Sequence, residues 1–203
     1  MNRKNNKGFT LIELLAVVVI LGVIMMLAIP NIVSTINRNK KEAFLEDAKK
    51  FQASVEYKLV SDTKLQKPNN NSALVLTLGQ VEKADISVSP YGTNYSPTLS
   101  FVVVTKEPRE VTIDDGSGRK DSSFSEYTYY VRLIACSNDT CSGDDIDQRY
   151  GINLARVDDK LQSDRYEMVV QAEEVDENLP TDKTYIQSVI GSGKSINYYG
   201  ATS

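Results

Sequence analysis

A single carboxylate, Glu13, interrupts an otherwise apolar run near the start of the chain, KGFTLIELLAVVVILGVIMMLAIPN. A charged side chain is costly in hydrocarbon, so once water is excluded this residue needs a cation as partner. The chain has no histidine, which is the usual neutral-pH general base and the commonest metal ligand. The residue types therefore point to ion pairing rather than catalysis, and we predict no enzyme activity, cofactor or metal site.

Two weaker patterns have ligand-binding readings. GSGKS (191–195) contains part of a phosphate-binding loop, but Ser188 occupies the position of the first glycine in GxxxxGK[ST], so we interpret it as a turn. A group of aspartates has the ligand type that calcium prefers, but without the order of an EF-hand loop, and such clusters are usually solvated. These aspartates are Asp114, Asp115, Asp144, Asp145 and Asp147. NNS, NYS and NDT fit the glycosylation sequon, a match that is common by chance.

The element that must position Glu13 is the apolar stretch 9–29. As a helix it is roughly 31 Å long at about 1.5 Å per residue, close to the ~30 Å hydrocarbon core of a bilayer. Arg3, Lys4 and Lys7 precede it and no acidic residue does. Basic residues favour the cytoplasmic side, so the sequence predicts a cytoplasmic N-terminus and an exported remainder.

Two ordinary explanations of this stretch fit less well. A secretory signal has an apolar core of about 7–15 residues and a small-x-small cleavage site, whereas here Met26 stands two residues before Ala28. A plain membrane anchor fits the length but does not explain Glu13.

The order of residues from Gly8 to Glu13 closely resembles the signal of type IV prepilins. In that family a membrane-embedded prepilin peptidase cuts on the cytoplasmic side after the glycine and methylates the new amine. The resemblance implies cleavage between Gly8 and Phe9, with Phe9 becoming N-methylphenylalanine. It covers about the first 60 residues and is most specific in the first fifteen.

The same resemblance gives roles to three further residues of the stem. Glu13 is expected to pair with the amine of Phe9 on a neighbouring subunit and so to set the register of assembly. Gly22 and Pro30 stand where pilin stems carry a glycine and a proline, and Pro30 weakens the helix by removing a backbone donor. The stretch between them is where a stem is expected to bend or melt in a filament.

After Pro30 the pattern becomes that of an amphipathic helix ending near Ser61. Its apolar positions are Ile32, Val33, Ile36, Phe44, Ala48, Phe51, Val55 and Leu59. Such a stripe must be covered, so we predict that it packs on a sheet. The expected organisation is a leader (1–8), a membrane and filament-core helix (9–30), an amphipathic half of the same helix (31–61) and an exported head (62–203).

The head reads as short strands separated by turn residues. Strands are predicted at 73–78, 86–89, 98–105, 127–136, 166–172 and 184–190, with a helical turn before 81–86 and loops at 67–72, 113–123 and 138–148. The expected fold class is α+β, with a long N-terminal helix on an antiparallel sheet, which is the plan of type IV pilins. The head contains 14 basic and 22 acidic residues, so nucleic-acid binding is not indicated.

Cys136 and Cys141 bracket a short turn at the end of the strongest predicted strand. An exported head lies where disulfides persist, so we favour a bridge between them, with free thiols as the alternative. The closed loop is short, and the expected stabilisation is about 2 kcal/mol.

The resulting hypothesis is a structural subunit of type IV pili, used for adhesion or motility. The precursor is expected in the membrane by a single pass, and the processed form in an extracellular filament. Its expected partners are copies of itself, the prepilin peptidase, and the assembly platform with its ATPase. A pseudopilin of a type II secretion or competence system is one alternative. A membrane-tethered extracellular binding or enzymatic domain is another.

Overall fold

A computed structural model describes residues 8–81, 86, 88–114, 119–137, 149–158, 165–176 and 178–200. The chain divides into two compact units, residues 1–39 and 40–203. One helix, α1 (Leu11–Ser61), contributes to both units. The predicted long N-terminal helix is therefore confirmed, and it is continuous through Gly22 and Pro30.

The second unit is built on a six-stranded sheet with the order β5-β4-β3-β2-β1-β6. The strands are β1 (Ser72–Thr77), β2 (Phe101–Asp114), β3 (Arg119–Ala135), β4 (Tyr150–Ala155), β5 (Val169–Gln171) and β6 (Ser195–Tyr198). Neighbouring strands are antiparallel except β1 and β6, which run parallel. The expected α+β class with a mainly antiparallel sheet is confirmed.

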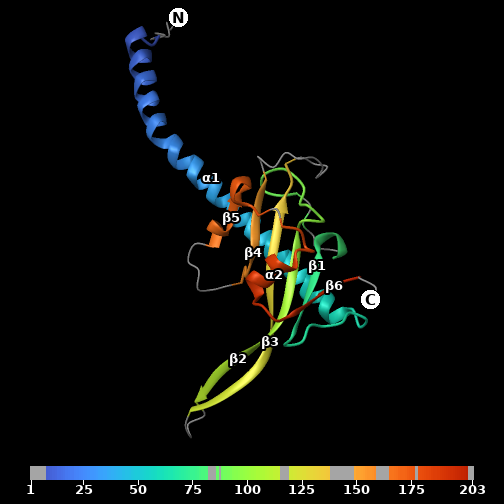
Figure 1. Cartoon of the computed structure of the whole chain (residues 1–203). Coiled ribbons are helices and arrows are strands. Elements are labelled where there is room, and N and C mark those ends of the chain that lie inside the picture. Colours follow the sequence, from blue (N-terminus) through green and yellow to red (C-terminus); the bar gives the residue numbers. More distant parts are fainter. Residues whose placement is uncertain are drawn as a thin grey trace, which may run out of the picture. The chain divides into compact units, whose positions relative to one another are not determined.

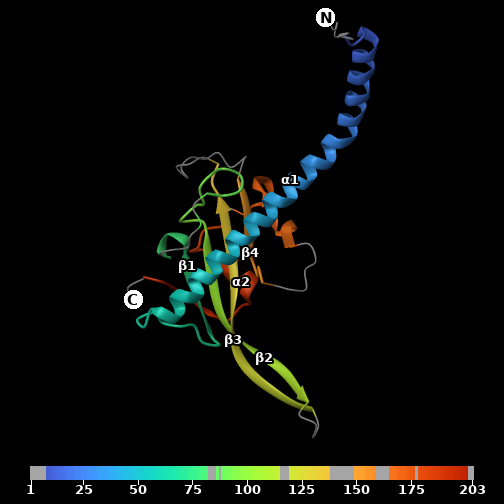
Figure 2. The same ribbon diagram turned by 180° about the vertical axis from the view of Figure 1, so that it is seen from behind.

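Each face of the sheet is covered by a helix (Figures 1 and 2). The part of α1 after residue 40 covers one face with Phe44, Ala48, Phe51, Val55 and Leu59, all at most 3% exposed. Each aliphatic or aromatic side chain buried in this way contributes roughly 1.5–3 kcal/mol, so this stripe accounts for much of the stability of the head. The earlier apolar positions Ile32, Val33 and Ile36 are about half exposed, at 56%, 51% and 48%.

The other face is covered by a short helix that the sequence analysis predicted as a strand. Residues 184–190 form most of α2 (Lys183–Ile190), so that prediction is wrong. Asp182 caps the helix by accepting a 3.0 Å hydrogen bond from the Tyr185 N–H, and Gly191 follows its end. Ile186 and Ile190, four residues apart, are buried against Phe101 and Val103 of β2.

Other strand predictions are partly right. The predicted strands 73–78, 98–105 and 127–136 correspond to β1, the start of β2 and the end of β3, and the short turn before 81–86 is the 3-10 helix η1 (Leu78–Gln80). Within 166–172 only Val169–Gln171 is a strand, and in 86–89 Val88 makes one isolated bridge to Asn94. The strands β4 and β6 were not predicted, and the predicted loop 138–148 lies outside the described residues.

The predicted loop 113–123 is wrong at both ends, because β2 and β3 continue into it. Their register runs without interruption from Phe101↔Arg132 to Asp114↔Arg119. Only the first five residues of β2 pair with β1, and β4 pairs with β3 from Val131 on. Beyond these points β2 and β3 form a two-stranded ribbon that extends past the rest of the sheet (Figures 1 and 2).

Candidate processing and assembly site

The residues at the expected cleavage point lie in extended chain directly before α1. Gly8, Phe9 and Thr10 are non-helical and exposed, and the Phe9 side chain is 87% exposed. A Cβ added at Gly8 would meet no atom within 4 Å, and Gly8 does not have a positive φ. The fold itself therefore does not require glycine at position 8. A requirement for glycine there comes from a molecule that binds this segment.

Glu13 is held at the start of α1 by Thr10. Its Oε2 accepts hydrogen bonds from the backbone N–H and the hydroxyl of Thr10, both at 2.8 Å, and its own N–H donates to Thr10 Oγ1 at 3.3 Å. This reciprocal arrangement is a capping box, which satisfies backbone donors that a helix N-terminus leaves free. The pattern Thr-x-x-Glu before an apolar run predicts it, but the sequence analysis did not use that signal.

The capping box leaves Glu13 able to bind a second partner. Among the described residues no hydrogen bond reaches its Oε1, and an ionised carboxylate has about four acceptor sites. A cut before Phe9 would keep the Thr10 N–H and hydroxyl and would place the new amine one residue upstream. The carboxylate would also offset the positive charge of that amine at the positive end of the helix dipole.

The helix that follows Glu13 is apolar on all sides. Its large apolar side chains in the described part are about half exposed or more, and none of the best apolar window is buried within the chain. By length and composition the helix is able to cross a membrane. A helix that is hydrophobic all round must be covered by lipid or by other helices. The exposed large apolar residues of this stretch are Leu14, Leu15, Val17, Val18, Val19, Ile20, Leu21, Val23, Ile24, Met25, Met26 and Ile29.

Gly22 and Pro30 lie within this apolar stretch and differ in their local effect. A Cβ at Gly22 would meet nothing within 4 Å, so the space beside it is open. Pro30 cannot donate to the carbonyl four residues earlier. Just after it, the hydroxyls of Ser34 and Thr35 both donate to the Asn31 carbonyl, at 3.0 and 2.8 Å, a pattern that commonly bends helices.

The two cysteines are placed unequally. Cys136 is buried directly after β3, whereas Cys141 lies outside the described residues, so their pairing stays a prediction. Of the aspartates considered for calcium, Asp114 is the last residue of β2, and the other four lie outside the described residues. Within the described residues no three His, Cys, Asp or Glu side chains gather as metal ligands.

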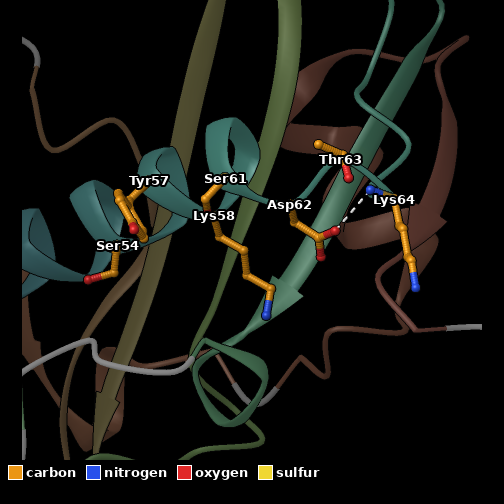
Figure 3. Close-up of a pocket in the computed structure, with 7 residues that line it drawn as sticks. All are labelled: Ser54, Tyr57, Lys58, Ser61, Asp62, Thr63 and Lys64. Atoms are coloured by element: carbon orange, nitrogen blue, oxygen red, sulfur yellow. Dashed lines mark hydrogen bonds between the residues drawn. The ribbon is translucent and has the colours of Figure 1, made fainter.

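A hollow of about 380 Å³ lies at the C-terminal end of α1 (Figure 3). Its polar groups have structural partners: Lys58 donates to the Gln80 carbonyl at 2.7 Å and lies over the Tyr199 ring. Asp62 accepts from the Tyr199 hydroxyl at 3.1 Å and from the Lys64 N–H at 3.0 Å. These contacts tie the end of α1 to the segment after β6, and they arrange no nucleophile or acid–base pair.

Two polar residues of the core were not anticipated from the sequence. Arg132 of β3 is 1% exposed and donates to the Asp176 carbonyl and to the Tyr185 hydroxyl, and burial lowers its pKa. Tyr95 is 5% exposed and donates to Asp47 of α1 at 2.7 Å; burial, and then this carboxylate, raise its pKa. Both residues join segments that are distant in sequence.

The comparison with protein families agrees with the geometry of the N-terminal segment. The model described as the prokaryotic N-terminal methylation motif matches residues 3–29. Neither a curated protein nor a solved structure gave a match. The matched range includes the exposed Gly8–Phe9 segment, the capped Glu13 and the apolar first half of α1. At residues 3–29 the chain therefore carries the signal sequence of a type IV prepilin, followed by an α+β fold consistent with that of type IV pilins.

Proposed function

We propose that this chain is the precursor of a structural subunit of a type IV pilus. A prepilin peptidase cleaves it between Gly8 and Phe9 and methylates the amine of Phe9. The leader, residues 1–8, stays on the cytoplasmic side with Arg3, Lys4 and Lys7. The processed subunit waits in the membrane by its single apolar helix and then enters an extracellular filament.

The observation that carries this proposal is the pairing state of Glu13. Its Oε2 is held by Thr10 at 2.8 Å, while Oε1 is available at the same end of an apolar, exposed helix. A tether needs no such group, because a carboxylate only raises the cost of membrane insertion. In a bundle of stems, the amine of Phe9 on a neighbouring copy gives that carboxylate its cation and fixes the register.

Assembly on this proposal is driven by covering the stem. The apolar side chains between Leu14 and Ile29 exchange lipid for the stems of other copies, through close packing rather than a new hydrophobic gain. Gly22 permits close approach of a neighbouring helix, and Pro30 allows the stem to bend or melt. The work of extraction from the membrane comes from a separate platform and ATPase.

The head is the surface that the filament displays for adhesion or motility. A bridge between Cys136 and Cys141 pins the loop after β3, at the end of the sheet that carries the core residue Ile134. A subunit of this kind has a structural role, in keeping with the lack of histidine in the chain.

The test is the N-terminal mass spectrum of protein sheared from the surface of its native cell. We expect a start at N-methyl-Phe9. The variant Gly8→Val, whose fold has room for the side chain, should be absent from the sheared material and should keep Met1 in the membrane fraction. A start at N-methyl-Phe9 found only in membranes would assign the chain to a pseudopilin of a secretion or competence system. An intact Met1 in the wild type, or a cut beyond Ala28, would refute the proposal and favour a tethered binding or enzymatic head.

A further inference from the structure

The ribbon formed by β2 and β3 has two unpaired edges. On the β2 side, pairing with β1 ends at Thr105, which leaves residues 106–114 free on that edge. On the β3 side, pairing with β4 begins at Val131, so no other strand of the described residues pairs with the backbone of 119–130 on that edge. Over this length each strand is paired within the described chain only with the other. An isolated two-stranded hairpin is only marginally stable in water, and this part of the ribbon gains no pairing from β1 or β4, so a further strand would add to its stability.

The β2 edge is protected against strand addition. Pro108 pairs with Ser125 within the ribbon, and proline has no N–H to donate. In a continuous ladder a proline faces its nitrogen outward, so the β2 edge lacks a donor at the third of its nine residues beyond Thr105. Proline on an edge is a common means by which proteins prevent unwanted pairing.

The β3 edge carries no such protection. Opposed residues of an antiparallel pair direct their N–H groups to the same side of the ladder, either both inward or both outward. Because Pro108 faces outward, so does Ser125, and with it Tyr127 and Tyr129. The direction of Ile134 agrees: its N–H donates to Ser100 Oγ on the β2 side, and it lies nine residues from Ser125, which puts Ser125 on the opposite side. No residue of β3 between 119 and 130 is proline.

The length of the ribbon beyond β1 is comparable to the length of one apolar stem. Nine residues of β2 beyond Thr105 extend about 30 Å at ~3.3 Å per residue. Two apolar stems of roughly 31 Å that overlap at all are offset along their axes by less than that length. The ribbon strands contain four basic and five acidic residues, against 14 and 22 in the whole head, so their charge does not oppose approach to another acidic head.

We propose that the outward backbone groups of β3 between residues 119 and 130, among them those of Ser125, Tyr127 and Tyr129, hydrogen-bond to the head of a second copy of this chain in the filament. The contact is strand addition, in which backbone groups supply the affinity. It ties heads to one another separately from the packing of their stems. This inference rests on the proposed function, because the filament brings the second copy within reach.

A pair of variants at one position tests it in the native cell. Ser125→Pro removes an outward N–H and mirrors Pro108, so it spares the bonds between β2 and β3, whereas Ser125→Val keeps the N–H. We expect both to be inserted in the membrane and cleaved after Gly8. Filament protein from Ser125→Pro should be at least about tenfold lower than from Ser125→Val, a difference of about 1.4 kcal/mol. Equal amounts would overturn the inference and leave the proposed function intact.

Hydrogen exchange on the wild type gives a second test that does not depend on a variant folding. We expect backbone amides in peptides covering 119–130 to exchange at least about tenfold more slowly in sheared filaments than in detergent-dispersed subunits. Peptides from α2, which is buried within each head, serve as the control and should not change. Equal exchange of 119–130 in the two states would overturn the inference, because this edge would then form no hydrogen bonds to another copy in the filament. Absence of wild-type filaments would instead refute the proposed function.

Discussion

Thr10 and Glu13 hold each other through three hydrogen bonds, so the carboxylate of Glu13 is oriented before any other chain approaches. Two roles are therefore combined in one residue: it closes the first turn of α1, and it keeps one oxygen available for a cation. Substitutions that separate these roles show which of them assembly requires.

Glu13→Gln should keep the helix cap and lose assembly. The amide oxygen of glutamine still accepts from Thr10, but the side chain carries no charge for the amine of Phe9. Breaking a buried ion pair costs about 3–5 kcal/mol, so we expect filament incorporation to fall by well over tenfold, with cleavage after Gly8 unchanged. The measurement is the filament-to-membrane ratio by immunoblot. Glu13→Ala should fail equally, and normal assembly of Glu13→Gln would show that the charge is dispensable.

The head should lose stability at alkaline pH. Burial raises the pKa of Tyr95 and, together with the nearby Tyr150, raises the pKa of Tyr91 to about 12. Unfolded tyrosine titrates near pH ~10, so above that pH the unfolded chain releases protons that the folded head retains. The free energy of unfolding should be level below pH ~10 on this account and fall above it.

Urea denaturation between pH 8 and 11.5 measures this slope. Tyr95→Phe removes one of the titrating phenols, so the decline above pH ~10 should be shallower by up to about 1.4 kcal/mol per pH unit. The variant also loses the 2.7 Å hydrogen bond to Asp47, which lowers stability equally at every pH below 10. An unchanged slope in Tyr95→Phe would mean that Tyr95 ionises in the folded head.

Arg132→Lys should destabilise the head more than Arg132→Met does. The groups that accept hydrogen bonds from Arg132, the Asp176 carbonyl and the Tyr185 hydroxyl, are uncharged, and the attraction of the Asp176 carboxylate is outweighed by burial, which lowers the pKa of Arg132. Lysine keeps a buried charge but cannot reach both acceptors with a planar fork, whereas methionine removes the desolvation cost and fills the space. We expect a loss of roughly 1–3 kcal/mol for lysine by urea denaturation. A greater loss for methionine would show that the charge itself stabilises the fold.

Gly151→Ala should be destabilising through one identifiable contact. A Cβ at position 151 would lie 2.6 Å from Ile134 Cδ1 and 3.2 Å from the Leu133 carbonyl oxygen. Overpacking of this kind costs about 1–3 kcal/mol. Ile134→Val removes the Cδ1 atom, so the double variant should lose less stability than the two single variants together. Strict additivity in thermal unfolding would place the strain at the Leu133 carbonyl instead.

The stem was predictable because its composition allows few alternatives. An apolar stretch of this length has to be a helix that spans or bundles, and basic residues only before it assign a direction. The apolar spacing from Phe44 to Leu59 likewise identified the face of α1 that meets the sheet. Local patterns were sufficient for these two segments because each is covered by one kind of partner: lipid or other stems in the first case and the sheet in the second.

The errors in the head have specific causes. Residues 184–190 contain tyrosine, valine and isoleucine, which favour strands, but the Asp182 cap and the spacing of Ile186 and Ile190 outweighed that propensity. The polar and glycine-containing stretch 113–123 indicated a loop, whereas the strands continue because each supplies the other's hydrogen bonds. The strand β4 was missed because Gly151 lowers the strand propensity of its sequence. The packing nevertheless needs glycine there, because a Cβ at position 151 would clash with Ile134.

The position of β6 has a consequence for the order in which the head can be completed. β1 lies between β2 and β6, and its pairing with β6 joins Ser72 to Ser195 and Val75 to Tyr198. One edge of β1 therefore stays open until residues 195–198 have been synthesised. A ribosome that stops before residue 195 releases a head whose strand Ser72–Thr77 is ready to pair with any other exposed strand. Closure of this edge of the sheet therefore depends on residues 195–198, which are more than a hundred positions away from β1 in the sequence.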